Sequence, residues 1–202
     1  MSHGEHYFTA SPATPALLRT IDVRLAGREV RVTTAPGVFS ADHLDHATRL
    51  LLEEVPPPPS AGDLLDLGCG WGPVTLTLAH ASPDARVWAV DVNERALDLT
   101  RRNAEADGAT GVRAVLPDEV PGDVRFAAIW SNPPIRIGKP AVHAMLSRWL
   151  PRLTPDGEAH LVVGKNLGAD SLARWIEQDL GLPTSRVTSA GGFRVLRVAH
   201  AG

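Results

Sequence analysis

A glycine-rich loop constrains the fold more than any other part of this sequence. Gly68, Gly70 and Gly72 stand at alternate positions directly after the apolar run 64–67, and Pro73 opens a stretch of helical character. Glycines at such a point permit a tight turn and let backbone amides approach a ligand without an intervening Cβ. The pattern predicts a strand–loop–helix unit of an open α/β sheet, in which ligands bind beyond the carboxyl ends of the strands.

Strand-like and helix-like segments alternate after this loop. Strands are expected at 64–67, 86–90, 112–115, 126–130 and 160–163, helices at 73–80, 94–107, 141–153 and 172–179, and a closing antiparallel pair around Val187 and at 193–198. Strands separated by helices form crossover units, which give a parallel sheet with helices on both faces. The predicted fold is therefore α/β, a doubly wound seven-stranded sheet with a C-terminal antiparallel strand pair.

Residues 1–55 are predicted to form a small N-terminal annex. Apolar residues alternate in 21–32 around Ala26-Gly27, which is typical of a β-hairpin, and Asp45 is placed to cap a short leucine-rich helix. The proline run 56–59 excludes helix and sheet and predicts a stiff connector. We therefore assign residues 62–202 to the main domain.

Composition excludes several classes of protein. The chain is 44% hydrophobic and 21% charged, an ordinary globular mix rather than a disordered one. We find no apolar run near the roughly 20 residues that span a bilayer and no secretory signal, so we expect a cytoplasmic location without a membrane partner. The single cysteine and the spacing of the histidines predict no metal. A basic final third could meet phosphates, although solvated surface charge explains it as well.

Carboxylates lie at the ends of two successive predicted strands, at Asp66 and Asp91. A pyrophosphate loop reads G-x-G-x-x-G, whereas Asp66 beside this G-x-G-x-G loop would repel a phosphate and attract an ammonium or sulfonium. Asp91 is placed to accept both hydroxyls of a ribose. A ligand with a ribose, a cationic tail and no phosphate fits S-adenosylmethionine (AdoMet) better than NAD. The alternative is that the glycines serve the turn only.

With this loop and both acids, the chain resembles the class I AdoMet-dependent methyltransferases, which are Rossmann-like. The resemblance implies that Asp66 and the glycines hold the methionine end, that Asp91 holds the ribose and that Val92 packs against the adenine. It implies S-adenosylhomocysteine as the product and no metal. The expected cofactor-binding residues are Phe39, Asp66, Gly68, Cys69, Gly70, Gly72, Asp91, Val92, Asp118 and Asn132.

The segment Asn132-Pro133-Pro134-Ile135 follows the strand that should lie beside the first one. Two prolines fix φ twice and remove two amide donors, so the loop presents carbonyl oxygens, and the Asn132 side chain adds another acceptor. Two converging acceptors suit an NH2 group and draw it towards the tetrahedral geometry of an attacking amine. We therefore predict these four residues as catalytic. The alternative is a loop breaker after a strand.

Asn132-Pro133-Pro134 also resembles motif IV of methyltransferases that act on adenine N6, guanine N2 or glutamine side chains. The fourth position of that motif is often aromatic and stacks on the target base. Ile135 departs from the pattern, since it packs without a π-face.

Further segments resemble the small-domain subgroup, typified by 16S ribosomal RNA guanine-N2 methyltransferases. The matching segments are 6–8, 37–40, 45–52, 132–139 and 191–196. The resemblance implies methyl transfer to guanine N2, with ribosomal RNA or the small ribosomal subunit as partner, and Phe39 and Ser40 covering the cofactor pocket. Known bacterial members carry two tandem copies of this domain. RNA docking by this single copy would rest on Arg136, Lys139, Lys165 and Arg194, on a partner subunit, or on Arg24, Arg28 and Arg31 of the hairpin.

Two other functions stay open at this point. One is an N-methyltransferase for a protein glutamine or a small-molecule amine, which needs no basic face. The other is a non-catalytic module that binds AdoMet. A homodimer is also left open.

Overall fold

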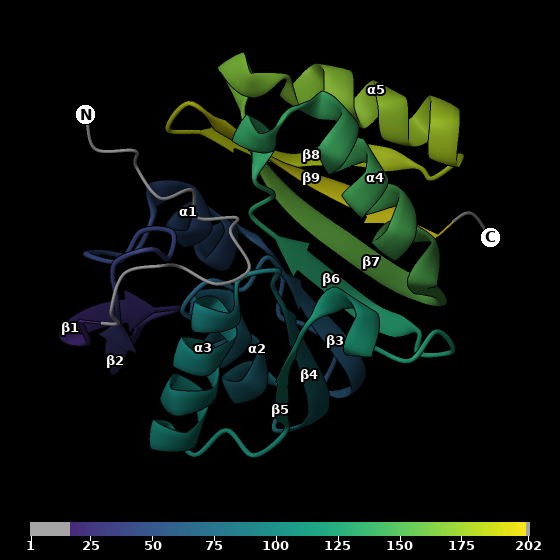
Figure 1. Ribbon diagram of the computed structural model, residues 1–202. Helices are drawn as coiled ribbons and strands as arrows, with labels where there is room; N and C mark the ends of the chain where they lie inside the picture. Colours follow the sequence, from purple (N-terminus) through teal and green to yellow (C-terminus); the bar gives the residue numbers. More distant parts are fainter. Residues whose placement is uncertain (1–16, 201–202) are drawn as a thin grey trace.

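The computed structural model describes residues 17–200, and a seven-stranded sheet forms its centre (Figure 1). Its strands are β3 (Ala61–Leu67), β4 (Asp84–Val90), β5 (Val112–Val115), β6 (Phe126–Ser131), β7 (Leu153–Gly164), β8 (Thr184–Ala190) and β9 (Phe193–Ala199). They lie in the order β5-β4-β3-β6-β7-β9-β8. The pairs among β3 to β7 are parallel, and β9 pairs antiparallel with both β7 and β8. The predicted sheet and its C-terminal antiparallel pair are therefore confirmed.

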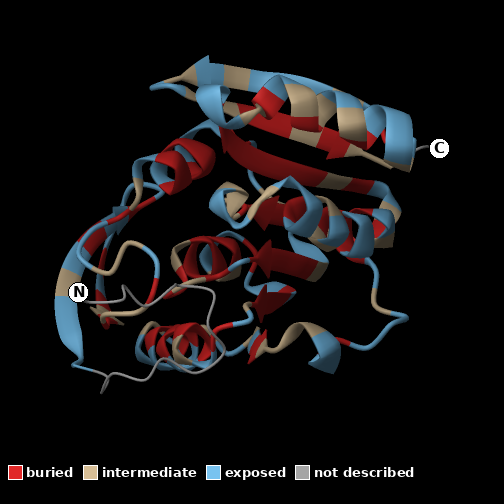
Figure 2. Cartoon of the chain, turned by 45° about the horizontal axis from the view of Figure 1, so that its top comes forward, coloured by how far each residue is buried: buried red, intermediate tan, exposed pale blue. Residues whose placement is uncertain are grey.

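Helices cover both faces of this sheet. One face is packed by α1 (His46–Glu54), α2 (Pro73–Ala81) and α3 (Glu94–Ala106), and the other by α4 (Lys139–Trp149) and α5 (Ala169–Leu180). Neighbouring residues of a strand point to opposite faces, so Leu64 joins the first hydrophobic cluster and Leu65 the second. Figure 2 shows burial concentrated in the strands and on the helix faces that meet them. The fold is thus doubly wound, as predicted.

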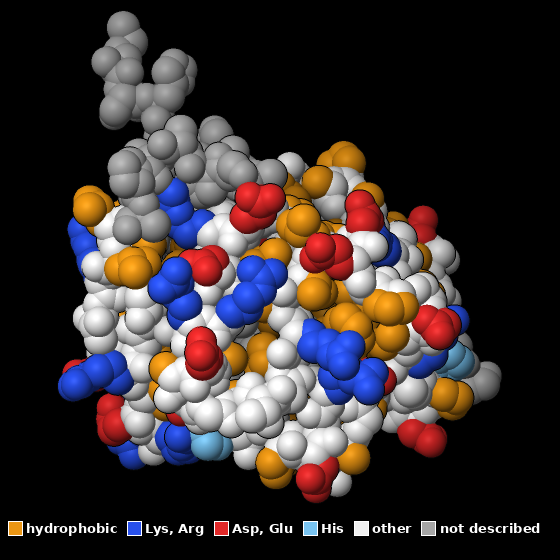
Figure 3. Space-filling view, turned by 60° about the horizontal axis from the view of Figure 1, so that its bottom comes forward, with side chains coloured by type: hydrophobic (Ala, Val, Ile, Leu, Met, Phe, Trp, Pro, Cys, Tyr) orange, Lys and Arg blue, Asp and Glu red, His pale blue; other side chains and the backbone are white. Residues whose placement is uncertain are grey.

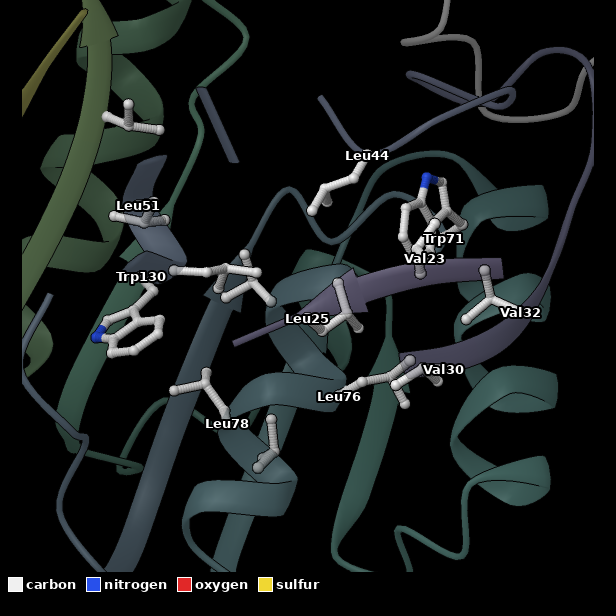
Figure 4. Packing of buried hydrophobic residues seen from close by; sticks show 14 of the residues in the cluster. Val23, Leu25, Val30, Val32, Leu44, Leu51, Trp71, Leu76, Leu78 and Trp130 are labelled. Carbon is white, nitrogen blue, oxygen red and sulfur yellow. The ribbon is translucent and has the colours of Figure 1, made fainter. Parts of the chain in front are cut away.

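The N-terminal hairpin packs against the first helix layer. Strands β1 (Arg19–Leu25) and β2 (Arg28–Thr34) pair antiparallel around Ala26-Gly27, where both residues have positive φ, 45° and 89°. The inward side chains of the hairpin join Trp71 and Leu76 in one cluster (Figure 4). Residues of α1 belong to the same cluster, so the hairpin and α1 share a hydrophobic core with the sheet. Whether residues 1–55 form a separate unit stays a prediction.

Two boundaries differ from the prediction around residues 150–160. The helix expected at 141–153 begins at Lys139 and ends at Trp149, where the short 3-10 helix η3 (Leu150–Arg152) takes over. Strand β7 begins at Leu153 rather than near residue 160. Its register against β6 shifts between Phe126 and Ala128, which absorbs the turn-like segment 154–157 as an irregularity within the strand.

The structure leaves part of the sequence argument outside its range. The segment His6-Tyr7-Phe8, quoted above for the family resemblance, lies outside the described residues. Within residues 17–200, no helix is long and apolar enough to cross a membrane. In the same residues, no group of three or more His, Cys, Asp or Glu side chains is arranged to hold a metal ion.

Candidate active site

The two motifs singled out in the sequence meet at the carboxyl ends of neighbouring strands. Strand β6 pairs with β3, and Asp66 stands opposite Trp130 in this register. One residue later, the buried Ser131 hydroxyl donates a hydrogen bond to the Leu67 carbonyl, with an Oγ–O distance of 2.6 Å. Because this bond joins the last residues of the two strands, it holds Asn132 beside the glycine loop.

A pocket opens at this junction and draws its lining from segments distant in the sequence. Its lining residues are Phe39, Ser40, Asp45, Thr48, Asp66, Gly68, Cys69, Gly70, Trp71, Pro73, Val74 and Asn132. Six of the expected cofactor-binding residues are in this set: Phe39, Asp66, Gly68, Cys69, Gly70 and Asn132. The structure thus brings the glycine loop, residues of the 39–48 segment and Asn132 around one space, whereas Pro133 and Pro134 are not part of the lining.

The glycine loop has the backbone conformation that its sequence suggested, but its amides donate hydrogen bonds within the protein instead of facing a ligand. Gly68, Gly70 and Gly72 have φ of 83°, 58° and 97°, in the left-handed region that favours glycine. The amides of Gly68 and Cys69 both donate to the Val90 carbonyl at the end of β4, at 2.8 and 3.1 Å. The Gly70 amide donates to Asp91 Oδ2 at 3.0 Å. These amides are engaged within the protein, so they do not form the anion cradle of a phosphate-binding loop.

Two buried carboxyl groups lie beside this loop. Asp66 is 1% exposed, and its Oδ2 accepts hydrogen bonds from Thr75 N at 2.8 Å and Thr75 Oγ1 at 2.6 Å. Burial raises the pKa of Asp66 to about 7, against the opposing effect of the Thr75 hydrogen bonds. Burial also raises the pKa of Asp91, whose two oxygens accept from Gly70 N and Asn93 N. A cation bound beside Asp66 would favour its ionised form.

The segment 36–40 is fastened over the pocket by hydrogen bonds from three side chains. Trp71 Nε1 donates to the Ser40 carbonyl at 3.1 Å, Asn93 Nδ2 to the Gly37 carbonyl at 2.9 Å, and Arg95 Nη1 to the Pro36 carbonyl at 2.7 Å. These donors stand on the glycine loop and at the start of α3. These hydrogen bonds fix the backbone of the segment, and Phe39, which is 45% exposed, lines the pocket.

The side chain of Asn132 is held by the beginning of α1. Its Nδ2 donates to Asp45 Oδ2 at 2.9 Å and to Thr48 Oγ1 at 3.1 Å. Both amide hydrogens are thereby used, and Oδ1 is the atom left to accept a hydrogen bond in the pocket. Asp45 was predicted as a helix cap, and Asp45 and Thr48 lie in a segment that resembles the subgroup, but neither was given a role in the site, because a contact across 87 residues leaves no local signal.

The Pro-Pro segment forms a tight turn after Asn132. The Pro133 carbonyl accepts from Ile135 N at 2.8 Å, and the Pro134 carbonyl accepts from Ile137 N at 3.0 Å in the 3-10 helix η2 (Ile135–Ile137). A carbonyl oxygen has two lone pairs, so each keeps one for another donor. Ile135 packs against the hydrophobic cluster beneath α4 and does not belong to the pocket lining.

Other predicted cofactor residues lie beside the pocket or away from it. Gly72 belongs to the glycine loop and Asp91 accepts from its Gly70 amide, but Gly72, Asp91 and Val92 do not line the pocket. The Asp118 side chain is 91% exposed and pairs with Arg148 at 2.7 Å, so the structure does not bring it to the pocket.

The predicted RNA-binding cations differ in what surrounds them. Arg136 and Lys165 are exposed, whereas Lys139 Nζ lies 3.4 Å from Ser171 Oγ and Arg194 pairs with Asp170. The hairpin arginines Arg24, Arg28 and Arg31 form ion pairs with Glu29, Asp107 and Asp22. On the face shown in Figure 3, acidic and basic side chains are interspersed rather than gathered into one basic field.

Comparison with known proteins finds a matching family profile and several similar sequences. Residues 29–197 match the profile of the methyltransferase small domain. The uncharacterized protein YbxB of Bacillus subtilis is 37% identical over 177 residues, 86% of this chain and 88% of that protein. Ribosomal RNA small subunit methyltransferase C of Pseudomonas aeruginosa is 35% identical over 191 residues, 92% of this chain but 56% of that protein.

A solved structure is similar over nearly the whole chain. The 16S rRNA N2 methyltransferase RsmC of Thermus thermophilus, in complex with AdoMet and guanosine, has a TM-score of 0.80 at 28% identity. The match covers 94% of this chain and 52% of that one. The chain thus spans about half the length of the ribosomal RNA methyltransferases that it resembles.

Proposed function

Since the chain belongs to the methyltransferase small domain family, we propose that it transfers a methyl group from AdoMet to an exocyclic amine, guanine N2 of ribosomal RNA. One observation carries the proposal: the amide nitrogen of Asn132 is fully occupied by Asp45 and Thr48, which leaves Oδ1 as an acceptor in a pocket shared with Asp66. The names of the longer relatives support ribosomal RNA as the substrate.

The residues around the pocket fit AdoMet. The loop amides are engaged by Val90 and Asp91, which disfavours a phosphate, while the buried Asp66 carboxyl favours a cation. Asp91 Oδ2 accepts from Gly70 N and Oδ1 from Asn93 N, and a carboxylate has further acceptor capacity for a ribose hydroxyl. When bound, AdoMet supplies a methyl group on a sulfonium, which is already a good leaving group.

The chain's own part in the reaction is alignment. Asn132 Oδ1 and the Pro133 carbonyl accept the two hydrogens of the amine and direct its lone pair towards the cofactor pocket. Such positioning lowers a barrier by up to several kcal/mol without strong acid–base catalysis. The surplus proton passes to water after transfer.

Substitution of Asn132 by alanine tests this assignment. We expect Asn132→Ala to lower kcat by about a hundredfold, because an unaligned amine loses most of its advantage in reactivity. Labelled methyl transfer to small ribosomal subunits and to free ribosomal RNA measures the rate, and calorimetry checks that AdoMet still binds. Unchanged turnover in the variant would contradict the proposed role.

The same assay separates the proposed substrate from the alternatives. Methyl transfer to a glutamine-containing protein or a small amine, and not to RNA, would show that the reaction is assigned correctly but that the substrate is not RNA. AdoMet binding without transfer to any amine would support a non-catalytic module. Affinity for RNA should fall steeply with salt if phosphate contacts contribute, and that dependence is absent for a neutral acceptor.

A further inference from the structure

The two ends of an asparagine amide have nearly the same shape but opposite hydrogen-bonding chemistry. The proposed reaction needs the oxygen of Asn132 towards the amine, because the NH2 end would set donor against donor. A carboxylate only accepts hydrogen bonds, so the 2.9 Å contact with Asp45 Oδ2 requires the nitrogen of Asn132 on that side. Thr48 Oγ1, at 3.1 Å, takes the second hydrogen.

The fold fixes Asp45 independently of Asn132. Asp45 is the N-cap of α1, and the same Oδ2 accepts from the Thr48 amide at 3.0 Å. Helix α1 is anchored by Leu51, which belongs to the hydrophobic cluster shared with β6 and β7, and its Thr48 is only 5% exposed. One oxygen atom therefore both begins a helix and orients a side chain on a strand end 87 residues away.

We propose that Asp45 is a positioning residue, which holds the Asn132 amide with Oδ1 towards the substrate amine and acts through Asn132 rather than on the substrate. This inference rests on the proposed function. It adds the requirement that the N-cap of α1 be a side chain long enough to reach Asn132 and able to accept from it.

Two substitutions separate capping from orientation. Asp45→Ser keeps a hydroxyl that caps the Thr48 amide but is too short to reach Asn132. Asp45→Asn keeps an oxygen that accepts from both groups. Asp98→Asn is the control for charge, since Asp98 is exposed on α3 and pairs with Arg102.

We expect kcat to fall when residue 45 loses the oxygen that accepts from Asn132, and not when it loses only its negative charge. We expect Asp45→Ser to lower kcat about tenfold or more with KM for AdoMet changed less than about twofold, and Asp45→Asn and Asp98→Asn to stay within about threefold of wild type. Wild-type kcat in Asp45→Ser would overturn the inference, as would an equal loss in Asp45→Asn.

A second measurement needs no bound AdoMet. Asn132→Asp sets a new carboxylate against Asp45, and the like charges should lower the thermal midpoint at mildly alkaline pH. In the Asp45→Ser background the same change should cost much less, which a double-mutant cycle reports as coupling. Additive losses would show that the two side chains do not face each other and would overturn the inference. Absence of methyl transfer by the wild-type protein to any amine would instead overturn the proposed function, while coupling would still support the placement of Asp45.

Discussion

The charge of Asp66 depends on pH in the neutral range. Its pKa of about 7 means that near neutral pH a bound cation competes with a proton for the same carboxylate. We therefore expect AdoMet to bind more weakly as pH falls below 7, by up to about tenfold per pH unit. Calorimetry across a pH series tests this, with Asp66→Asn as the variant that should bind weakly at every pH. A flat profile for the wild-type protein would show that Asp66 does not meet the cationic end.

His160 lies in the middle of β7 and is 5% exposed. Neither ring nitrogen has a hydrogen-bond partner among the described residues, and burial lowers the pKa of His160 to about 4. In the unfolded chain the imidazole of His160 is therefore protonated below about pH 6.5, whereas in the folded protein it is protonated only below about pH 4. Between these values stability should fall with falling pH, by about 3 kcal/mol at the lower end.

Denaturant unfolding of His160→Leu against wild type isolates this effect. The raised pKa of Asp66 acts in the opposite direction, since its contribution to stability falls as pH rises towards 7, so the difference between the two proteins is the informative quantity. The difference should grow in favour of the variant from pH 7 to pH 4. His43→Gln, at an exposed histidine, serves as the control. Parallel pH profiles would contradict the prediction.

These side chains also show which site residues a sequence can reveal. Asp66, Asp91 and Asn132 were found because each lies at the end of an apolar strand, and parallel strands end at one edge of a sheet. Asp45 was recognised as a cap from its local pattern, but its contact with Asn132 arises only when α1 packs against the sheet. Asp118 is likewise exposed and paired with Arg148, 30 residues away, which its local pattern does not indicate.

The turn from β3 into α2 depends on Gly72 for two separate reasons. Its φ of 97° strains any residue with a side chain, and a Cβ there would lie 3.1 Å from Thr100 Oγ1. Gly108, after α3, has a φ of 73° and open space around it. We expect Gly108→Ala to cost roughly 1 kcal/mol and Gly72→Ala clearly more, with weaker AdoMet binding in the latter only. If both variants lost the same free energy of unfolding in denaturant, Thr100 would have moved away from the new Cβ without an energetic cost.

The order of helices and strands was predictable because the hydrophobic pattern alternates cleanly along the main domain. The largest errors of the prediction lie between residues 150 and 160, at the end of α4 and at the start of β7. Pro155-Asp156-Gly157 reads as a turn, yet β7 continues through it as an irregularity without partners in β6. A Cβ on Gly157 would lie 2.7 Å from the Phe126 carbonyl. Gly157 therefore allows a close approach of two strands, which no pattern within β7 indicates.

The charges of the whole molecule suggest where RNA would lie. The hairpin arginines are paired with carboxylates, and Arg194 is paired with Asp170. Arg136 in η2 and Lys165 in the 3-10 helix η4 (Lys165–Leu167) are exposed, and each follows a strand that ends at the same edge as Asn132. Arg136 and Lys165 thus follow strands that end at the sheet edge of Asn132, while each of the three hairpin arginines has a carboxylate partner.

A salt series can decide between these two surfaces. We expect Arg136→Glu or Lys165→Glu to weaken RNA binding and to reduce the slope of log affinity against log salt by roughly 0.7 for each lost contact with a single-stranded phosphate. Arg24→Glu, at a residue already beside Glu29, should leave the slope unchanged. Fluorescence anisotropy with a ribosomal RNA fragment gives both quantities. The reverse result would place the RNA across the hairpin, away from the strand ends that carry Asn132, and a base could then reach Asn132 only by a longer path.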